Sequence, residues 1–345
     1  MIRALTFTLL LGLPVFLPGA DMTGSLQRAE QNRPAASADE QEIFKPESVS
    51  PYIIEWYIDI NEDADLNHIR RSLNLKIRNH MSFRCGGGCT AETFDIQVAD
   101  AKQNKTVALK ISFERGDFHQ FLFFKRENSD STGSEKWRFI GDIASYDQRH
   151  GPPKHRIESG DDRTWFVVRE LWGQGSGAIA YGETWHEIKQ SELREVLRYP
   201  VEGHDIPCRR QLGRSYKSIL IRHGLANGTY TIPVQFLVSY NMSECDGGND
   251  SPPLFAKAQK AYYVWSGEKE RFVLDTLQSD IAEKEISSVY NIEGLSREQF
   301  VEHNFSELSD IARRGDAEQK DWLRQFLIGM QDSPRKTALQ KAFRQ

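Results

Sequence analysis

TYTIPVQFLVSY, residues 229–240, is the stretch from which the fold class is best inferred. Apolar side chains stand at every second position of it, namely Tyr230, Ile232, Val234, Phe236, Val238 and Tyr240. A period of two is that of a β-strand with one buried face. Pro233 has no N–H to donate to a neighbouring strand. We therefore expect this strand at the edge of a sheet, or with a local bulge.

Runs of the same kind extend on both sides of this strand. From Pro51 to Asp275, β-branched and aromatic residues form short runs separated by glycine, asparagine and aspartate, as strands are separated by turns. Further strands are expected at residues 52–60, 73–77, 94–98, 107–113, 118–126, 137–143, 217–222 and 262–274. The sequence therefore predicts a mainly antiparallel β-domain, sheet-like or sandwich-like, over residues 50–275.

A long β-hairpin is expected over residues 163–188. If it is centred on Gly175, Trp165 and Trp185 face each other directly, a pairing worth about 0.2 to 1 kcal/mol over alanine. Trp172 has the opposite parity, so we expect it on the other face unless a bulge intervenes. Because it stands at the mouth of the loop, Trp172 is also the tryptophan that we expect to be exposed.

The loop of this hairpin, GQGSG at residues 173–177, invites comparison with two glycine-rich catalytic motifs. A nucleophile elbow has glycine two residues before its serine, but Gln174 stands there. A phosphate loop needs a lysine and a following helix, whereas Ala178 begins a returning strand. We interpret the segment as a hairpin turn.

The spacing of apolar residues becomes helical after Asp275, so residues 276–345 are predicted to form a small α-helical region that packs on the β-domain. Ser296 and Gln299 make a capping box, and Leu295 and Phe300 occupy the positions of a hydrophobic staple around it. The inward face of this first helix is expected to carry Phe300, Leu308, Ile311 and Ala312.

This first helix is expected to end at Gly315, which tolerates a left-handed conformation. A second helix should begin at Asp316, and a third should have Ser333 as its cap and Pro334 in its first turn.

The N-terminal segment MIRALTFTLLLGLPVFLPGA, residues 1–20, is typical of a secretory signal peptide. One positive charge, Arg3, precedes an apolar core, and small residues lead to a cleavage site after Ala20. The alternative is a retained anchor, but the run is shorter than the ~20 apolar residues that span a bilayer. Residues 21–49 are predicted to be a flexible polar leader. We expect a secreted or periplasmic protein without a transmembrane span after cleavage.

The chain has four cysteines, Cys85, Cys89, Cys208 and Cys245, which fit two disulfides in an oxidising compartment. We favour Cys85 with Cys89, because RCGGGC places three glycines where a tight turn brings the sulfurs together, and Cys208 with Cys245. A four-cysteine zinc site is the rival interpretation, but neither pair has the spacing of a zinc knuckle.

Charge and composition exclude some classes of function. The net charge is −5, and no stripe of lysine and arginine is present, so nucleic-acid binding is not expected. Asp59, Asn61, Asp63 and Asp65 alternate as in a calcium loop, but that motif needs glycine at position 64 and glutamate at position 70. We expect no metal and no cofactor.

Five histidines, His150, His155, His186, His204 and His223, fall within the predicted β-domain. His204 precedes Asp205 in a turn, and carboxylates such as Glu183 and Glu187 are available as partners. A histidine beside carboxylates can act as a general base. The candidate catalytic group of a hydrolase is therefore His204, Asp205, Glu183 and Glu187.

The absence of a specific catalytic motif favours a non-enzymatic function. We expect an exported binding protein or an envelope-associated structural protein, whose partner is an extracytoplasmic protein or a glycan. One alternative is a secreted hydrolase that acts on an extracellular polymer through the His204 group. The other is a carbohydrate-binding module that uses Trp172, since the chain has seven tryptophans and 11% aromatic residues.

Overall fold

The computed structural model describes residues 49–75, 83–86, 88–98, 105–113, 118–127, 136–145, 154–160, 162–175, 178–189, 192–205, 212–221, 223–226, 229–242, 253–290 and 296–344. All of them belong to one unit, Phe44–Gln345. The predicted signal peptide, most of the predicted leader, and His150, Cys208, Cys245 and Leu295 lie outside the described residues. The expectations for those segments stay predictions.

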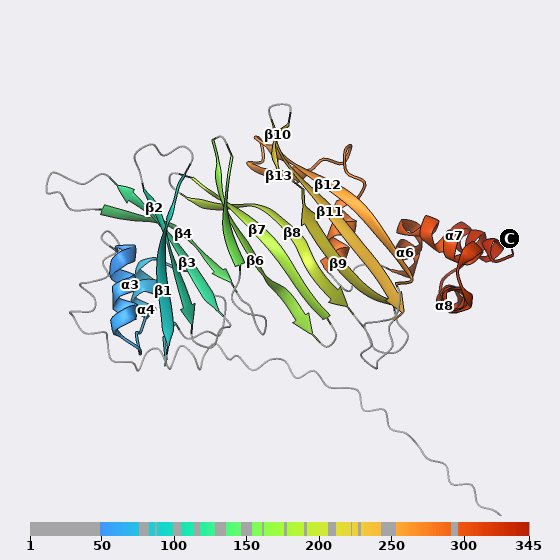
Figure 1. The fold of residues 1–345 in the computed structure, drawn as a ribbon, viewed down its shortest axis with the longest axis horizontal. Coiled ribbons are helices and arrows are strands. Elements are labelled where there is room, and N and C mark those ends of the chain that lie inside the picture. Colours follow the sequence, from blue (N-terminus) through green and yellow to red (C-terminus); the bar gives the residue numbers. More distant parts are fainter. Residues whose placement is uncertain are drawn as a thin grey trace, which may run out of the picture. The chain divides into compact units, whose positions relative to one another are not determined.

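The prediction of a mainly antiparallel β-fold is confirmed, with two sheets (Figure 1). The smaller sheet has the order β1 (Cys89–Ile96), β2 (Thr106–Phe113), β3 (His119–Glu127) and β4 (Lys136–Ser145). The larger sheet has the order β13 (Arg271–Leu274), β12 (Phe255–Ser266), β11 (Thr229–Met242), β9 (Leu212–Leu220), β8 (Leu193–Asp205), β7 (Ala178–Ile188), β6 (Thr164–Gly175) and β5 (Lys154–Ser159), with β10 (Gly224–Ala226) paired to β11.

β11 contains the stretch 229–240, and its even-numbered apolar side chains from Tyr230 to Tyr240 are buried as predicted. The prediction of an edge position was wrong, because β11 lies between β9 and β12. Pro233 is tolerated there for a local reason. Pairing with β10 ends at Thr231 and pairing with β9 begins at Val234, so Pro233 stands at a gap in the ladder where no N–H is needed.

Residues 52–60, predicted as a strand, form the helix α3 (Pro51–Ile60) instead. Pro51 at the first helical position favours a helix start, and Ile54, Tyr57 and Ile58 are buried at helical spacing. The period was misjudged because apolar residues occur on every side of this helix. Residues 73–75, the described part of another predicted strand, form a turn after the short helix α4 (Asn67–Ser72), so the prediction was wrong for these residues.

The smaller sheet has an apolar layer on each face. On one face, residues of α3 and α4 pack with residues of β2 and β3, among them Ile54, Ile69, Val107 and Leu122. On the other face, the rings of Phe121 and Phe123 lie 5.2 and 4.9 Å from that of Phe166 in β6 of the larger sheet. This second contact is the sandwich-like part of the fold.

The larger sheet curls around the main aromatic core. The ring of Trp165 in β6 lies 5.2 Å from that of Tyr230 in β11 and 5.8 Å from that of Phe272 in β13. Five strands separate β6 from β13 in the sheet order, namely β7, β8, β9, β11 and β12. Such contacts require the sheet to bend until its distant strands approach each other.

The hairpin of β6 and β7 is confirmed, but its predicted register was wrong. Trp165 pairs with Glu187, and Trp185 pairs with Val167, so the two tryptophans are diagonal neighbours whose rings lie 5.9 Å apart. The ladder shifts between Leu171 and Gly173, so Trp172 is the extra residue of a β-bulge.

β12 and β13 divide the predicted strand 262–274, because a turn at residues 267–270 interrupts it. Predicted strand 217–222 is the end of β9, and the predictions at 94–98, 107–113, 118–126 and 137–143 correspond to β1, β2, β3 and β4.

The C-terminal helical region is also confirmed. It consists of α5 (Glu283–Tyr290), α6 (Arg297–His303), α7 (Phe305–Arg314), α8 (Ala317–Ile328) and α9 (Pro334–Ala342). The capping box at Ser296, the helix start at Asp316 and the cap at Ser333 are present as predicted, and Asp316 also forms a capping box with Gln319. The first predicted helix is divided at Asn304 into α6 and α7.

Gly315 ends α7, but its φ of −58° is not left-handed, which corrects the prediction. Glycine is needed there for space, because a Cβ would lie 2.6 Å from the carbonyl oxygen of Ile311. The predicted Cys85–Cys89 disulfide is present, with Cα atoms 4.9 Å apart. Within the described ranges, no helix combines the length and the apolar character needed to cross a membrane.

Candidate functional site

An open groove of about 520 Å³ lies on the larger sheet at one end of β7, β8, β9 and β11. Its walls consist of Ile179, Tyr181, Glu202, Gly203, His204, Ser215, Tyr216, Lys217, Leu237 and Ser239. The volume is within the range typical of small-molecule sites, about 300 to 1,000 Å³. The groove is therefore the candidate functional site.

Strand register builds the groove from two rows of directly opposed residues. One row contains Ile179, His204, Ser215 and Ser239, and the other contains Tyr181, Glu202, Lys217 and Leu237. Opposed side chains in antiparallel strands have Cβ atoms about 4.5 to 5.5 Å apart. Each row therefore presents four side chains to the same small region of the sheet.

A β-bulge in β8 determines which residues of that strand join the rows. Gly182 pairs with Pro200 and Tyr181 pairs with Glu202, so Val201 is the extra residue. Without this bulge, Val201 would stand opposite Tyr181, and the alternation of β8 side chains would be reversed. The bulge thus brings Glu202 and His204 into the groove.

Gly203 lies between the two rows with the opposite parity, so a side chain there would point to the core face of the sheet, where its opposed neighbour Tyr216 is buried. A Cβ at this position would lie 2.5 Å from the carbonyl oxygen of Ile179 and 2.5 Å from the hydroxyl of Tyr216. Any larger residue at position 203 would have to displace both of them.

The groove has an excess of hydrogen-bond donors. Its acidic residue, Glu202, accepts a hydrogen bond from Arg169 at 2.5 Å. Among the described residues, the side chains of Lys217 and His204 have no hydrogen-bond or ion-pair partner, and the hydroxyls of Ser215 and Ser239 have none either. Lys217 and His204 are both exposed.

The four candidate catalytic residues do not form one site. His204 lies in the groove, and Asp205 follows it at the end of β8, with its side chain outside the described part. Glu183 and Glu187 are buried in β7 and bind other groups. The structure therefore shows no histidine–carboxylate pair made from these residues within the described part of the chain.

Glu183 belongs to a partly buried polar network inside the curled sheet. Arg156 donates two hydrogen bonds to its carboxylate, at 2.6 and 2.9 Å, and the hydroxyl of Tyr199 donates a third at 2.7 Å. Arg156 also binds Glu158, which contacts Nε2 of His223 at 2.8 Å. Burial would raise the pKa of Glu158, but the hydrogen bonds from Arg156 and His223 outweigh burial and lower it.

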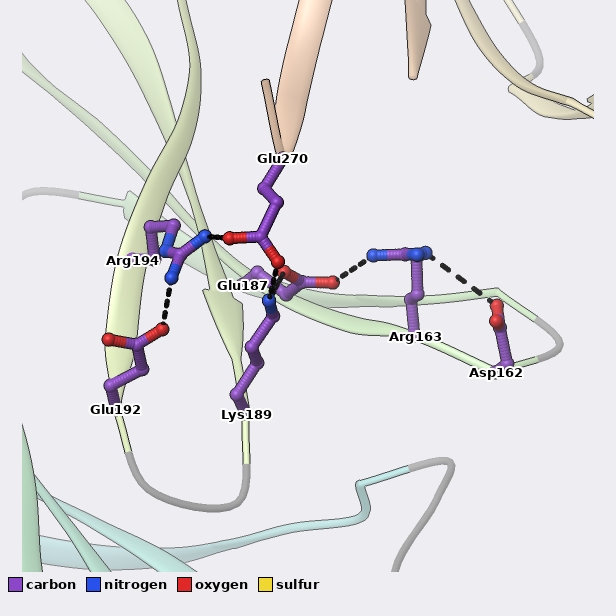
Figure 2. A network of polar contacts seen from close by, with 7 residues as sticks. All are labelled: Asp162, Arg163, Glu187, Lys189, Glu192, Arg194 and Glu270. Atoms are coloured by element: carbon purple, nitrogen blue, oxygen red, sulfur yellow. Dashed lines mark hydrogen bonds and ion pairs between the residues drawn. The ribbon is translucent and has the colours of Figure 1, made fainter. Parts of the chain in front are cut away.

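Glu187 belongs to a second network, shown in Figure 2. Its carboxylate accepts from Arg163 and lies 3.7 Å from Lys189. Lys189 and Arg194 in turn bind Glu270 in the turn between β12 and β13, Lys189 at 3.0 Å. This network connects the β7–β8 hairpin to the turn before the last strand of the sheet.

His186 and His155 lie apart from both networks. Burial, followed by the charge of Arg198, lowers the pKa of His186 to about 4. His155 packs with Phe94 and Phe166, at 5.2 and 5.4 Å between ring centroids, and burial lowers its pKa as well. Both are therefore favoured in the neutral form.

Trp172 is half-buried rather than exposed as predicted. The guanidinium of Arg198 lies 4.4 Å from its ring centroid, and a Cβ at Gly182 would lie 2.0 Å from ring carbons. The bulge and the missing side chain of Gly182 together give the indole its place on the sheet.

Asp65, from the acidic segment after α3, accepts hydrogen bonds from Arg84 at 2.9 Å and from Asn67. The described part of the chain contains no group of three or more histidine, cysteine or acidic side chains suited to a metal ion.

Sequence reasoning found His204 but missed the other donors of the groove. Ser215 and Lys217 alternate with Tyr216, but Ser218 on the buried face of β9 is also polar and Ile219 on the exposed face is apolar, so the sequence shows no clear polar face there. It does not indicate that β8 and β11 place their own polar residues beside it. Comparison of the chain with protein-family models, curated proteins and solved structures found no match.

Proposed function

We propose that this protein is a non-catalytic binding protein that holds a small ligand in the groove on its larger sheet. The observation that carries this proposal is the group of donors there, Lys217, His204, Ser215 and Ser239, which have no partner among the described residues. Exposed polar groups that converge on a concave site and have no role in folding are typical of ligand recognition.

The arrangement of the carboxylates supports a binding function over hydrolysis. Glu183 is held by Arg156 and Tyr199, and Glu187 by Arg163, so both carboxylates serve buried contacts. A general base must lie within about 3 Å of the proton that it removes, or reach it through one water. Carboxylates that are already held by arginine do not suit that task.

We propose that the protein works outside the cytoplasm, secreted or periplasmic. The predicted signal peptide at residues 1–20 supports this location. The Cys85–Cys89 disulfide supports it too, because disulfides persist in oxidising compartments. Fractionation of cells that express the full chain should place the processed protein outside the cytoplasm, and an intact reduced chain in the cytosol would contradict it.

A thermal-shift screen with a small-molecule library tests the binding function. Ser239→Trp fills the groove, so ligands that raise the melting temperature of the wild type should lose their effect on this variant. Thr231→Trp is the control, because Thr231 is eight residues away on β11, about 27 Å along the strand. Turnover of a glycan, peptide or ester that disappears in Glu183→Gln or Glu187→Gln would overturn the proposal.

A further inference from the structure

The chemistry of the groove also indicates what kind of ligand it holds, provided that it is the binding site proposed above. Ser215 pairs with His204 on one side and with Ser239 on the other. Lys217 is two residues from Ser215 on the same strand, about 7 Å away. An ammonium, an imidazole and two hydroxyls are thus within reach of one small polar group.

The formal charges in the lining, Lys217 and Glu202, cancel, and Arg169 beside the groove brings the local sum to one positive charge. Glu202 is the acidic residue in the lining, and Arg169 binds it at 2.5 Å, which leaves the charge of Lys217 uncompensated among the described residues. The whole chain carries a net charge of −5, so this positive site stands out from its surroundings. An anionic group is the complementary partner.

The remaining walls are apolar. Ile179 and Leu237 line the groove, and Leu237 is 37% exposed although it is a large hydrophobic residue. Leu237 and Ser239 pair with Ala258 and Ala256 of β12, both exposed, so small side chains continue the two rows onto the next strand. An apolar chain or ring that lies on this surface would be removed from water.

We infer that the groove binds a small organic carboxylate with an apolar chain or ring, whose carboxylate accepts hydrogen bonds from Lys217, His204 and the two serines. One cation with hydroxyl donors suits a single negative charge. Sites for doubly charged phosphate typically add a bidentate arginine or a helix N-terminus, and neither is present in the lining of this groove.

Isothermal titration of the full chain with decanoate and decylammonium tests this inference. These probes have the same chain and opposite charges, and decanoate should bind at least 10-fold more tightly. Lys217→Glu should weaken decanoate binding by about 10-fold or more, and Lys217→Arg should keep it within about threefold. Lys284→Glu, the same charge change on the exposed surface of α5, should leave it unchanged.

Equal binding of the two probes, or full decanoate affinity in Lys217→Glu, would overturn the inference. The library screen separates this failure from failure of the proposed function. If Ser239→Trp still abolishes the effect of other ligands, the groove is a binding site for another chemical class. If no ligand depends on the groove, both proposals are wrong. Circular dichroism of each variant confirms that the fold is retained.

Discussion

The interior of the curled sheet and the groove on its surface use charge in opposite ways. Inside, Arg156 is held by Glu183 and Glu158, and Glu183 also accepts from Tyr199. In the groove, Lys217 and His204 have no partner within the described residues. A buried charge needs a partner for the protein to fold, whereas an exposed charge does not. The interior network therefore serves stability, and the groove is free to serve recognition.

The largest expected difference between the two regions is in stability. Arg156→Ala should lower the free energy of unfolding by about 3 kcal/mol, because it leaves the carboxylate of Glu183 buried without its cation. Lys217→Ala should change it by less than about 0.5 kcal/mol. Urea denaturation measures both values. Equal effects of the two substitutions would remove the distinction between a structural and a recognition charge.

Acid should lower the stability of the fold through the burial of two histidines, His186 and His155. His186 stays neutral in the folded state down to about pH 4, whereas in the unfolded chain it takes up a proton near pH 6.5. The unfolded state thus binds more protons below pH 6.5, so stability is full above that pH and falls between 6.5 and 4. His155, whose pKa is also lowered, acts in the same direction.

We expect a loss of about 3 kcal/mol from His186 over this window, and His186→Gln should remove that share of the pH dependence. Glu158 has a lowered pKa, so its stabilisation of the fold is complete above pH 4.5 and is lost only as the pH falls below that value. Urea denaturation at a series of pH values measures the effect, and a slope unchanged by His186→Gln would disprove it.

A smaller effect is expected where the groove meets the core. Gly203→Ala should lower the free energy of unfolding by about 1 to 2 kcal/mol, because its Cβ would collide with Ile179 and Tyr216. Gly224→Ala is the control, since a Cβ there meets nothing within 4 Å. Thermal unfolding compares the two variants, and similar melting temperatures would show that the sheet adjusts to the extra methyl group.

Local signals in the sequence predicted local structure well. The caps at Ser296, Asp316 and Ser333 act within three residues of each helix start, and the structure contains all three. The alternation in β11 likewise predicted its buried face. The prediction failed at α3 because the local signal was missing there: a helix that is apolar on every side shows no helical period in its sequence.

Register and strand neighbours could not be predicted in the same way. One extra residue in β6, Trp172, and two in β8, Val196 and Val201, change which side chains face each other. None of these bulges has a signal in the single sequence. Because the groove depends on the register of β7, β8, β9 and β11 together, His204 was found as an isolated residue and Lys217 was missed.

The ion pairs around Glu270 have a consequence for how the larger sheet opens. Lys189 and Arg194 hold the β12–β13 turn from one side, while Trp165 and Phe272 hold the same region by ring contact. Added salt weakens attraction between exposed charges but leaves apolar contacts intact or strengthens them. The β12–β13 turn is therefore held to the rest of the sheet by two kinds of contact: ion pairs that salt weakens, and an aromatic contact that salt leaves intact or strengthens.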